Sequence, residues 1–127
     1  MSSATYDTGA LIAAERGDRR VWARHQRLVA RRLLPTVPAA VLAEAWRGGA
    51  RQASLVRLLG MCEIEALSEE HARNVGVLAG KAHHQDIVDV SVVEGAARRG
   101  DAILTSDPDE LAAIARAASI DVVIEPI

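Results

Sequence analysis

The sequence is poor in aromatic side chains and in cysteine, and each shortage excludes a class of function. Two Trp, one Tyr and no Phe occur in 127 residues. A bound nucleic acid would therefore not lie on a base-stacking platform like those of general single-strand binding proteins. The single cysteine, Cys62, excludes an internal disulfide and a cysteine metal cluster. Any metal ion would have to be held by oxygen or by histidine.

Long apolar runs are also missing. No stretch approaches the roughly 18 apolar residues that a membrane-spanning helix needs. The first residues, MSSATYDTG, lack the basic region and apolar core of a signal peptide. We therefore expect a cytoplasmic protein that makes no use of a membrane. The length and the apolar content of 50% fit one globular domain over residues 1–127.

Lysine is almost absent, and the charge is unevenly distributed. Residues 1–57 hold ten Arg against four acids, whereas residues 58–127 hold five basic residues against thirteen acids. The net charge of −2 argues against a general polyanion binder. Arginine nevertheless suits bidentate phosphate contacts, and Arg20, Arg24 and Arg27 lie on one amphipathic helical pattern. Such a face is more often simply solvated, but guidance of a nucleic-acid backbone or contact with a partner chain stays open.

Short apolar stretches alternate with helical patterns along the chain. We expect strands at 3–6, 33–37, 63–66, 102–105 and 122–124, and helices at 10–16, 19–32, 38–46, 52–59, 69–83, 86–99 and 108–117. Asp18 and Ser68 are expected N-caps, and Gly17 and Gly100 are expected helix stops. Strands this short and apolar, separated by helices, indicate a parallel sheet covered on both faces. The sequence predicts a three-layer α/β/α domain with a central parallel sheet of four to five short strands.

Three acids near one predicted strand have both a structural and a functional interpretation. In the structural one, Asp86 is an N-cap and Asp89 a first-turn acid, while Asp107 caps a helix that has Pro108 at its first position and Glu110 completing a capping box. In the functional one, Asp89 and Asp107 reach the carboxyl edge of the sheet, where ligands of open α/β folds bind. Carboxylates gathered there suggest a hard-cation site.

Two further acids strengthen the functional interpretation. Asp7 ends the first predicted strand, at the same edge as Asp107. Glu44 lies in the apolar helix PAAVLAEAW, where it is either on the outward face or buried at a cost that a cation or a donor must offset. Carboxylates at one point raise each other's pKa values. A divalent cation removes that conflict.

Asp7 in YDTGALIA, Glu44 in PAAVLAEAWRGG, Asp89 in DIVDVSVVEGAARRG and Asp107 in LTSDPDEL follow one another in a familiar order. With these motifs the chain closely resembles the PIN-domain ribonucleases, and among them the VapC-type toxins of bacterial toxin–antitoxin pairs. The resemblance implies that the four acids hold Mg²⁺ or Mn²⁺ for hydrolysis of RNA phosphodiester bonds. It also implies a homodimer and a cognate antitoxin that blocks the site.

The resemblance assigns roles to neighbouring residues as well. Asp89 is preferred to Asp86 as a principal ligand because eleven residues separate it from the helix-ending Gly100, as in the family pattern. Asp86 is then a cap or an auxiliary acid that holds water. Hydroxyls that would orient a water or a phosphate oxygen, unless they serve only in turns and caps, are those of Thr8, Thr105 and Ser106.

Other polar residues have simpler interpretations. Asp109 and Glu110 are expected to be helix-start charges, and His83 and His84 to suit the dipole at a helix end. A phospho-acceptor receiver domain would need an Asp after the strand at 63–66, which is absent, and a Lys after a late strand. The alternative that stays open is a catalytically inactive PIN-like module that binds RNA or protein.

Overall fold

The computed structural model describes residues 3–127, and its five strands form one parallel sheet. The strands are β1 (Ala4–Tyr6), β2 (Thr36–Pro38), β3 (Glu63–Glu65), β4 (Ala102–Thr105) and β5 (Ile124–Pro126), in the order β3-β2-β1-β4-β5. Every neighbouring pair is parallel, so all five carboxyl ends meet at one edge. This order differs from the 2-1-3-4-5 order of receiver-type folds. The predicted α/β class and parallel sheet are confirmed.

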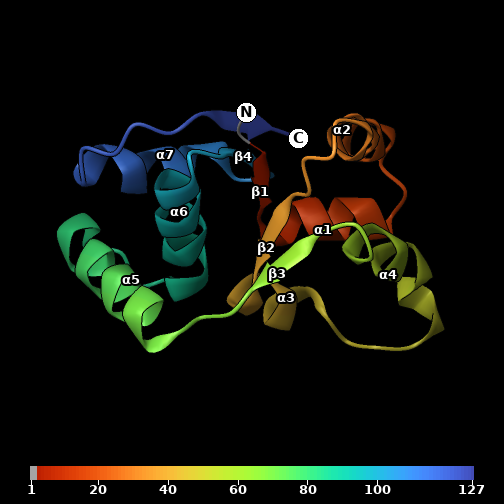
Figure 1. Ribbon diagram of the computed structural model, residues 1–127. Coiled ribbons are helices and arrows are strands. Elements are labelled where there is room, and N and C mark those ends of the chain that lie inside the picture. The colour runs from red at the N-terminus through yellow and green to blue at the C-terminus, as the bar shows by residue number, and fades with distance from the viewer. Residues whose placement is uncertain (1–2) are drawn as a thin grey trace.

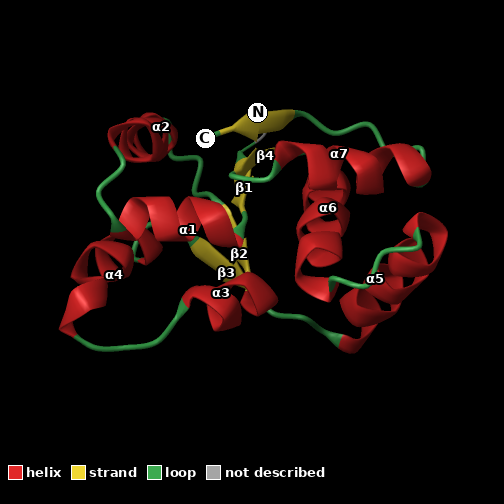
Figure 2. Ribbon diagram, turned by 180° about the vertical axis from the view of Figure 1, so that it is seen from behind, coloured by secondary structure: helices red, strands yellow, loops and turns green. Residues whose placement is uncertain are grey.

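Helices cover both faces of this sheet. Figures 1 and 2 show α1 (Thr8–Glu15), α2 (Arg19–Ala30) and α4 (Ala53–Leu59) on one side, and α5 (Glu69–Ala82), α6 (Ile87–Arg99) and α7 (Pro108–Ala117) on the other. The short α3 (Ala39–Ala45) follows β2 directly, and a 3₁₀ turn (Ala50–Gln52) leads into α4. The architecture has the three layers that the sequence predicts.

The core lies along β1 and α6. All three residues of β1 are buried, and Tyr6 is completely inaccessible. Val90, Val92 and Val93 of α6 are also fully buried, each such side chain contributing about 1.5–3 kcal/mol through removal of apolar surface from water. Because β1 and α6 are anchored in this way, the residues that follow β1 and begin α6 have fixed backbone positions.

The predicted helix ends are confirmed where they depend on local hydrogen bonds. The side chain of Asp18 accepts from two backbone N–H groups of α2, and that of Ser68 accepts from His71 N. Gly17 and Gly100 have φ angles of 78° and 74°, which glycine adopts without strain. No helix among residues 3–127 is long and apolar enough to cross a bilayer.

Several predicted boundaries of strands and helices required correction. β2 begins at Thr36 rather than at residue 33, because the N–H of Leu33 still bonds to Leu28 O of the preceding helix. Pro38 is the last residue of β2 and the N-cap of α3, not part of the first helical turn. β5 covers Ile124–Pro126 instead of 122–124, and α1 begins at Thr8 because Asp7 caps it.

Candidate functional site

Asp7 is the most deeply placed acid at the carboxyl edge of the sheet. It follows β1, is 5% exposed, and accepts a hydrogen bond of 2.8 Å from Ala10 N at the start of α1. The hydroxyl of Thr105, at the end of β4, donates to its other oxygen. Burial raises the pKa of Asp7 above its ordinary value, although these donors work in the opposite direction. Because burial disfavours the ionised form of Asp7, a bound cation would stabilise its carboxylate.

Asp107 reaches the same edge from β4, the strand next to β1. Its backbone N–H donates to Thr105 Oγ1 over 2.8 Å, so one threonine joins Asp7 to the turn that carries Asp107. The Asp107 side chain is exposed and makes no capping bond, and Glu110 completes no capping box. Asp107 is therefore the N-cap residue before Pro108, as predicted, but the predicted capping bonds are absent and its carboxylate is available.

Close packing fixes this turn against the start of α1. A Cβ atom added to Gly9 would lie 1.7 Å from Ser106 Oγ, far inside van der Waals contact. Glycine at this position lets the two segments touch. Ser106 itself is exposed beside Asp107, so its hydroxyl is accessible at the edge.

Glu44 joins the edge from α3. It is exposed, as expected for the outward face of an amphipathic helix. Thr8 Oγ1 donates to Glu44 Oε1 over 2.6 Å, which ties the carboxylate to the residue that follows Asp7. The structure thus brings Glu44 beside the end of β1 without burying it.

The two acids at the start of α6 have different surroundings, as the sequence suggests. Asp86 is the N-cap, accepting from Val88 N at 3.0 Å and Asp89 N at 3.2 Å. Asp89 is half-buried in the first turn. Burial and then the charge of Asp86 raise the pKa of Asp89 to about 6, with smaller contributions from Asp107 and Asp7. Asp89 therefore lies within electrostatic reach of both acids.

We call Asp7, Glu44, Asp89 and Asp107 the carboxylate edge. They come from four different segments, and hydroxyls or helix starts hold them in place. The group is open: among residues 3–127, the one set of three ligands with atoms within 4.8 Å of one another is His84, Asp89 and Glu110. An ion shared by the whole edge would be held partly through water, which suits Mg²⁺.

The close approach of His84 and Glu110 was missed by the sequence reasoning. His84 Nε2 lies 2.9 Å from Glu110 Oε2, and its Nδ1 accepts from Asp86 N. His84 therefore faces α7 and does not serve the end of α5, and Glu110 is more than a helix-start charge. No local pattern signals this pair, because the two residues are 26 positions apart.

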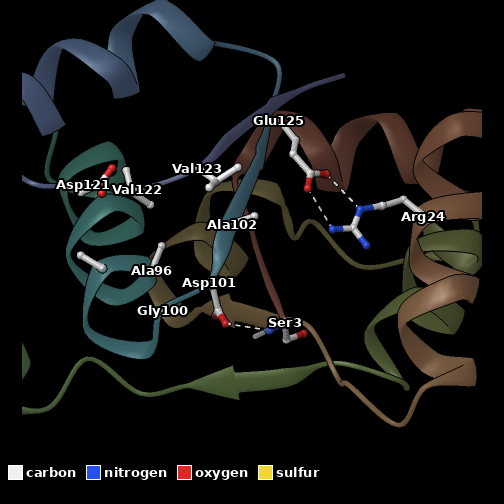
Figure 3. Close-up of a pocket in the computed structure, with 11 residues that line it drawn as sticks. Ser3, Arg24, Ala96, Gly100, Asp101, Ala102, Asp121, Val122, Val123 and Glu125 are labelled. Atoms are coloured by element: carbon white, nitrogen blue, oxygen red, sulfur yellow. Dashed lines mark hydrogen bonds and ion pairs between the residues drawn. The ribbon is translucent and has the colours of Figure 1, made fainter. Parts of the chain in front are cut away.

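The predicted basic face divides into two parts. Arg24 forms two 2.9 Å hydrogen bonds with the Glu125 carboxylate on β5, as Figure 3 shows, and is therefore half-buried. Arg20 and Arg27 are exposed. Helix α2, which carries these arginines, lies at the top of both ribbon views, and α3, which carries Glu44, lies toward the bottom.

The cavity in Figure 3 offers a contrast to the carboxylate edge. It has a volume of about 370 Å³ and lies between α6, β4 and β5. Two of its carboxylates already have arginine partners: Asp101 pairs with Arg99 at 3.0 Å and Glu125 with Arg24 at 2.9 Å. These acids have no unmet need for a cation.

No family model and no curated protein sequence matches the chain. Its structure is similar to one in the crystal structure of VapBC2 from Rickettsia felis bound to a DNA fragment from their promoter. The TM-score is 0.74 and the identity 16%, and the match covers 98% of each chain. At this identity the likeness shows the fold. The chain has the PIN-like fold, in the form found in VapBC2, that the sequence resemblance predicts.

Proposed function

We propose that the protein is a metal-dependent endoribonuclease and the toxin of a toxin–antitoxin pair. The observation that carries this proposal is the convergence of four carboxylates at the carboxyl edge of a PIN-like sheet, where burial and like charge raise the pKa values of Asp7 and Asp89. The sites of metal-assisted phosphodiester hydrolysis gather carboxylates in this way.

The donor set fits Mg²⁺ or Mn²⁺. Asp7 and Asp89 are the principal ligands of the proposal, and Glu44 and Asp107 complete the site directly or through water. All are oxygen donors, which hard cations prefer. The cation would supply Lewis acidity, polarising a water for attack on the phosphodiester and stabilising the leaving oxygen.

Neighbouring groups of the chain position this site. Thr105 orients Asp7 through its hydroxyl and fixes the turn of Asp107 through its oxygen. Thr8 holds Glu44 toward the end of β1. We infer from these bonds that both threonines position the acids and that Ser106 is the exposed hydroxyl for a water or a phosphate oxygen. Asp86 acts as the helix cap and raises the pKa of Asp89 through its charge.

The proposed partners are single-stranded or looped RNA, a second copy of the chain and a cognate antitoxin, all in the cytoplasm. The fold shared with a chain of VapBC2 supports the antitoxin. Glu44 and Asp107 are exposed, so a protein segment laid across the carboxylate edge would reach them. We propose that the antitoxin blocks the enzyme by covering this edge.

The test is cleavage of a defined single-stranded RNA by the purified protein. We expect cleavage with Mg²⁺ or Mn²⁺ and none in excess EDTA. Asp7→Asn and Asp89→Asn should each lower the rate at least a hundredfold. The matched control is Asp109→Asn, which removes an exposed acid from the start of α7. Cleavage that survives EDTA would overturn the metal mechanism, and RNA binding without cleavage would favour the inactive binding module.

A further inference from the structure

A second set of metal ligands lies beside the carboxylate edge, where the ends of α5, α6 and α7 meet. His84 follows α5, Asp89 lies in the first turn of α6, and Glu110 lies in the first turn of α7. One ligand atom from each lies within 4.8 Å of the other two. Only Asp89 belongs to both groups.

The backbone holds these three residues in place. His83 ends α5 in the left-handed conformation with φ of 51°, and the N–H of His84 bonds to Ala79 O over 3.1 Å. The adjoining residue Leu111 is completely buried, which fixes the first turn of α7. The imidazole and the two carboxylates are therefore presented by rigid ends of helices, as a preformed site requires.

The charge of this group is not balanced by basic residues. His84 is the one cationic partner that the described residues give to Glu110, over 2.9 Å. Asp89 accepts no side-chain hydrogen bond from an arginine or lysine among residues 3–127. The hydrogen bond to Glu110 raises the pKa of His84, so the imidazole must release its extra proton before it can bind a metal ion. The deprotonated imidazole and the two carboxylates then carry a charge of −2, which a divalent cation would cancel.

We propose that His84, Asp89 and Glu110 form a site for a transition-metal ion of the Zn²⁺ type, separate from the Mg²⁺ or Mn²⁺ site of the carboxylate edge. Imidazole is a ligand that favours Zn²⁺, Ni²⁺ and Co²⁺, whereas Mg²⁺ prefers oxygen. Three protein ligands with one position left for water is a common arrangement for zinc.

Binding requires a change of tautomer at His84. The bond from Asp86 N to Nδ1, 3.2 Å long, marks the tautomer in which Nε2 carries the proton shared with Glu110. A cation at Nε2 moves that proton to Nδ1, where it would face the Asp86 N–H, also a donor. The 3.2 Å bond from Asp86 N is therefore broken, and the imidazole must turn away from this N–H.

The shared ligand has a functional consequence, which rests on the proposed nuclease. Asp89 bound to Zn²⁺ is withdrawn from the carboxylate edge, so Zn²⁺ and Mg²⁺ oppose each other. Linkage makes this opposition reciprocal: each ion weakens the binding of the other by the same factor. Zn²⁺ thus inhibits RNA cleavage while leaving the fold intact.

The test begins with binding to the metal-stripped protein, measured by calorimetry with Zn²⁺ and by visible absorption with Co²⁺. We expect one ion per chain and a Co²⁺ spectrum with nitrogen ligation. His84→Gln and Glu110→Gln should weaken Zn²⁺ binding at least tenfold. Their neighbours provide matched controls, because His83→Gln and Asp109→Asn remove the same groups one position away and should bind Zn²⁺ as the wild type does.

Each outcome separates this site from the nuclease. Equal Zn²⁺ affinity in wild type and His84→Gln, or equal losses in His84→Gln and His83→Gln, would overturn the site. A tenfold loss confined to His84→Gln and Glu110→Gln supports it, even in a protein that cuts no RNA. In an active protein, His84→Gln should keep its Mg²⁺-dependent rate and lose at least tenfold in sensitivity to Zn²⁺.

Discussion

Glu65 at the end of β3 and Asp89 at the start of α6 are both carboxylates, yet their pKa values are shifted in opposite directions. Hydrogen bonds from Arg98, and then from Arg99, lower the pKa of Glu65 to about 2. Burial and the nearby acid Asp86 raise the pKa of Asp89 to about 6. The difference lies in the partners, since both side chains are only partly buried. Paired acids stabilise the fold, whereas unpaired acids create a demand for a cation.

Glu65 belongs to a group of acids that are all paired with arginines. We call Glu65, Glu94, Asp101, Arg98 and Arg99 the arginine network. Arg99 alone reaches Glu65 at 2.7 Å, Asp101 at 3.0 Å and the hydroxyl of Thr5 at 2.8 Å. A Cβ atom on Gly95 would lie 2.8 Å from the Arg99 guanidinium, so glycine makes room for it. The network joins β1, β3, α6 and the start of β4.

The largest effect is expected from breaking this network. Glu65→Gln should lower the free energy of unfolding at pH 7 by about 2 kcal/mol: a pKa shift from 4.5 to about 2 corresponds to roughly 3 kcal/mol, reduced here by solvent screening. The depressed pKa places this stabilisation above pH 4.5, and it is lost as the pH falls toward 2. Urea denaturation at several pH values measures it.

The control for this prediction is Glu63→Gln. Glu63 lies on the same strand, is exposed and has no side-chain partner among the described residues. Its replacement should change stability by less than about 0.5 kcal/mol. If Glu65→Gln were as harmless as Glu63→Gln, the arginine network would be a surface arrangement with no structural weight.

The second expected effect is an increase in stability, and it comes from replacing Asp89, which has no arginine partner among the described residues. The folded protein holds the Asp89 proton up to about pH 6, against 3.8 for the ordinary group. The contribution of Asp89 to the free energy of unfolding therefore falls as the pH rises from about 4 to 6. Above pH 6 the ionised carboxylate destabilises the fold by the full amount. Asp89→Asn should then raise the metal-free unfolding free energy at pH 7 by about 1 kcal/mol, after allowance for screening.

Asp86 provides the matched comparison for Asp89. Asp86→Asn keeps the N-cap and should leave stability almost unchanged, whereas Asp86→Ala should lower it by about 1 kcal/mol. Thermal melts between pH 4 and pH 8 without metal distinguish the variants. An Asp89→Asn protein that melts below the wild type across this range would show that Asp89 is a structural residue.

The contrast between the two regions also explains what the sequence could predict. The caps formed by Asp18, Ser68 and Asp86 were predictable because each bond joins residues two or three positions apart. The α/β class followed from apolar strands alternating with helices. The starts of β2 and β5 were misplaced, because Leu33 and Val122 are apolar residues that lie just before the residues that form the strands.

Contacts between distant segments were beyond the reach of local patterns. Arg24 and Glu125 are 101 positions apart, and Thr105 and Asp7 are 98 positions apart. The residues around either partner do not indicate the other one. The meeting of Asp7 and Asp107 at one edge was nonetheless predicted, because parallel strands bring the acids that follow them to one edge. The neutralising arginines were not, so the sequence alone did not show which acids would be paired.

The smallest effect on stability tests whether the exposed arginines of α2 belong to either region. The guanidinium groups of Arg20 and Arg27 form no hydrogen bond or ion pair with the described residues, so replacing both by Gln should change the unfolding free energy by less than about 0.5 kcal/mol. If they guide RNA, each lost phosphate contact should lower the salt slope of RNA binding by about 0.7.

Arg24→Gln is the comparison: it should leave the slope unchanged and lower stability by up to about 1 kcal/mol, because Arg24 is paired with Glu125. Fluorescence anisotropy with single-stranded RNA in EDTA measures binding without cleavage, and an unchanged slope in the double variant would assign this face to solvent or to a protein partner.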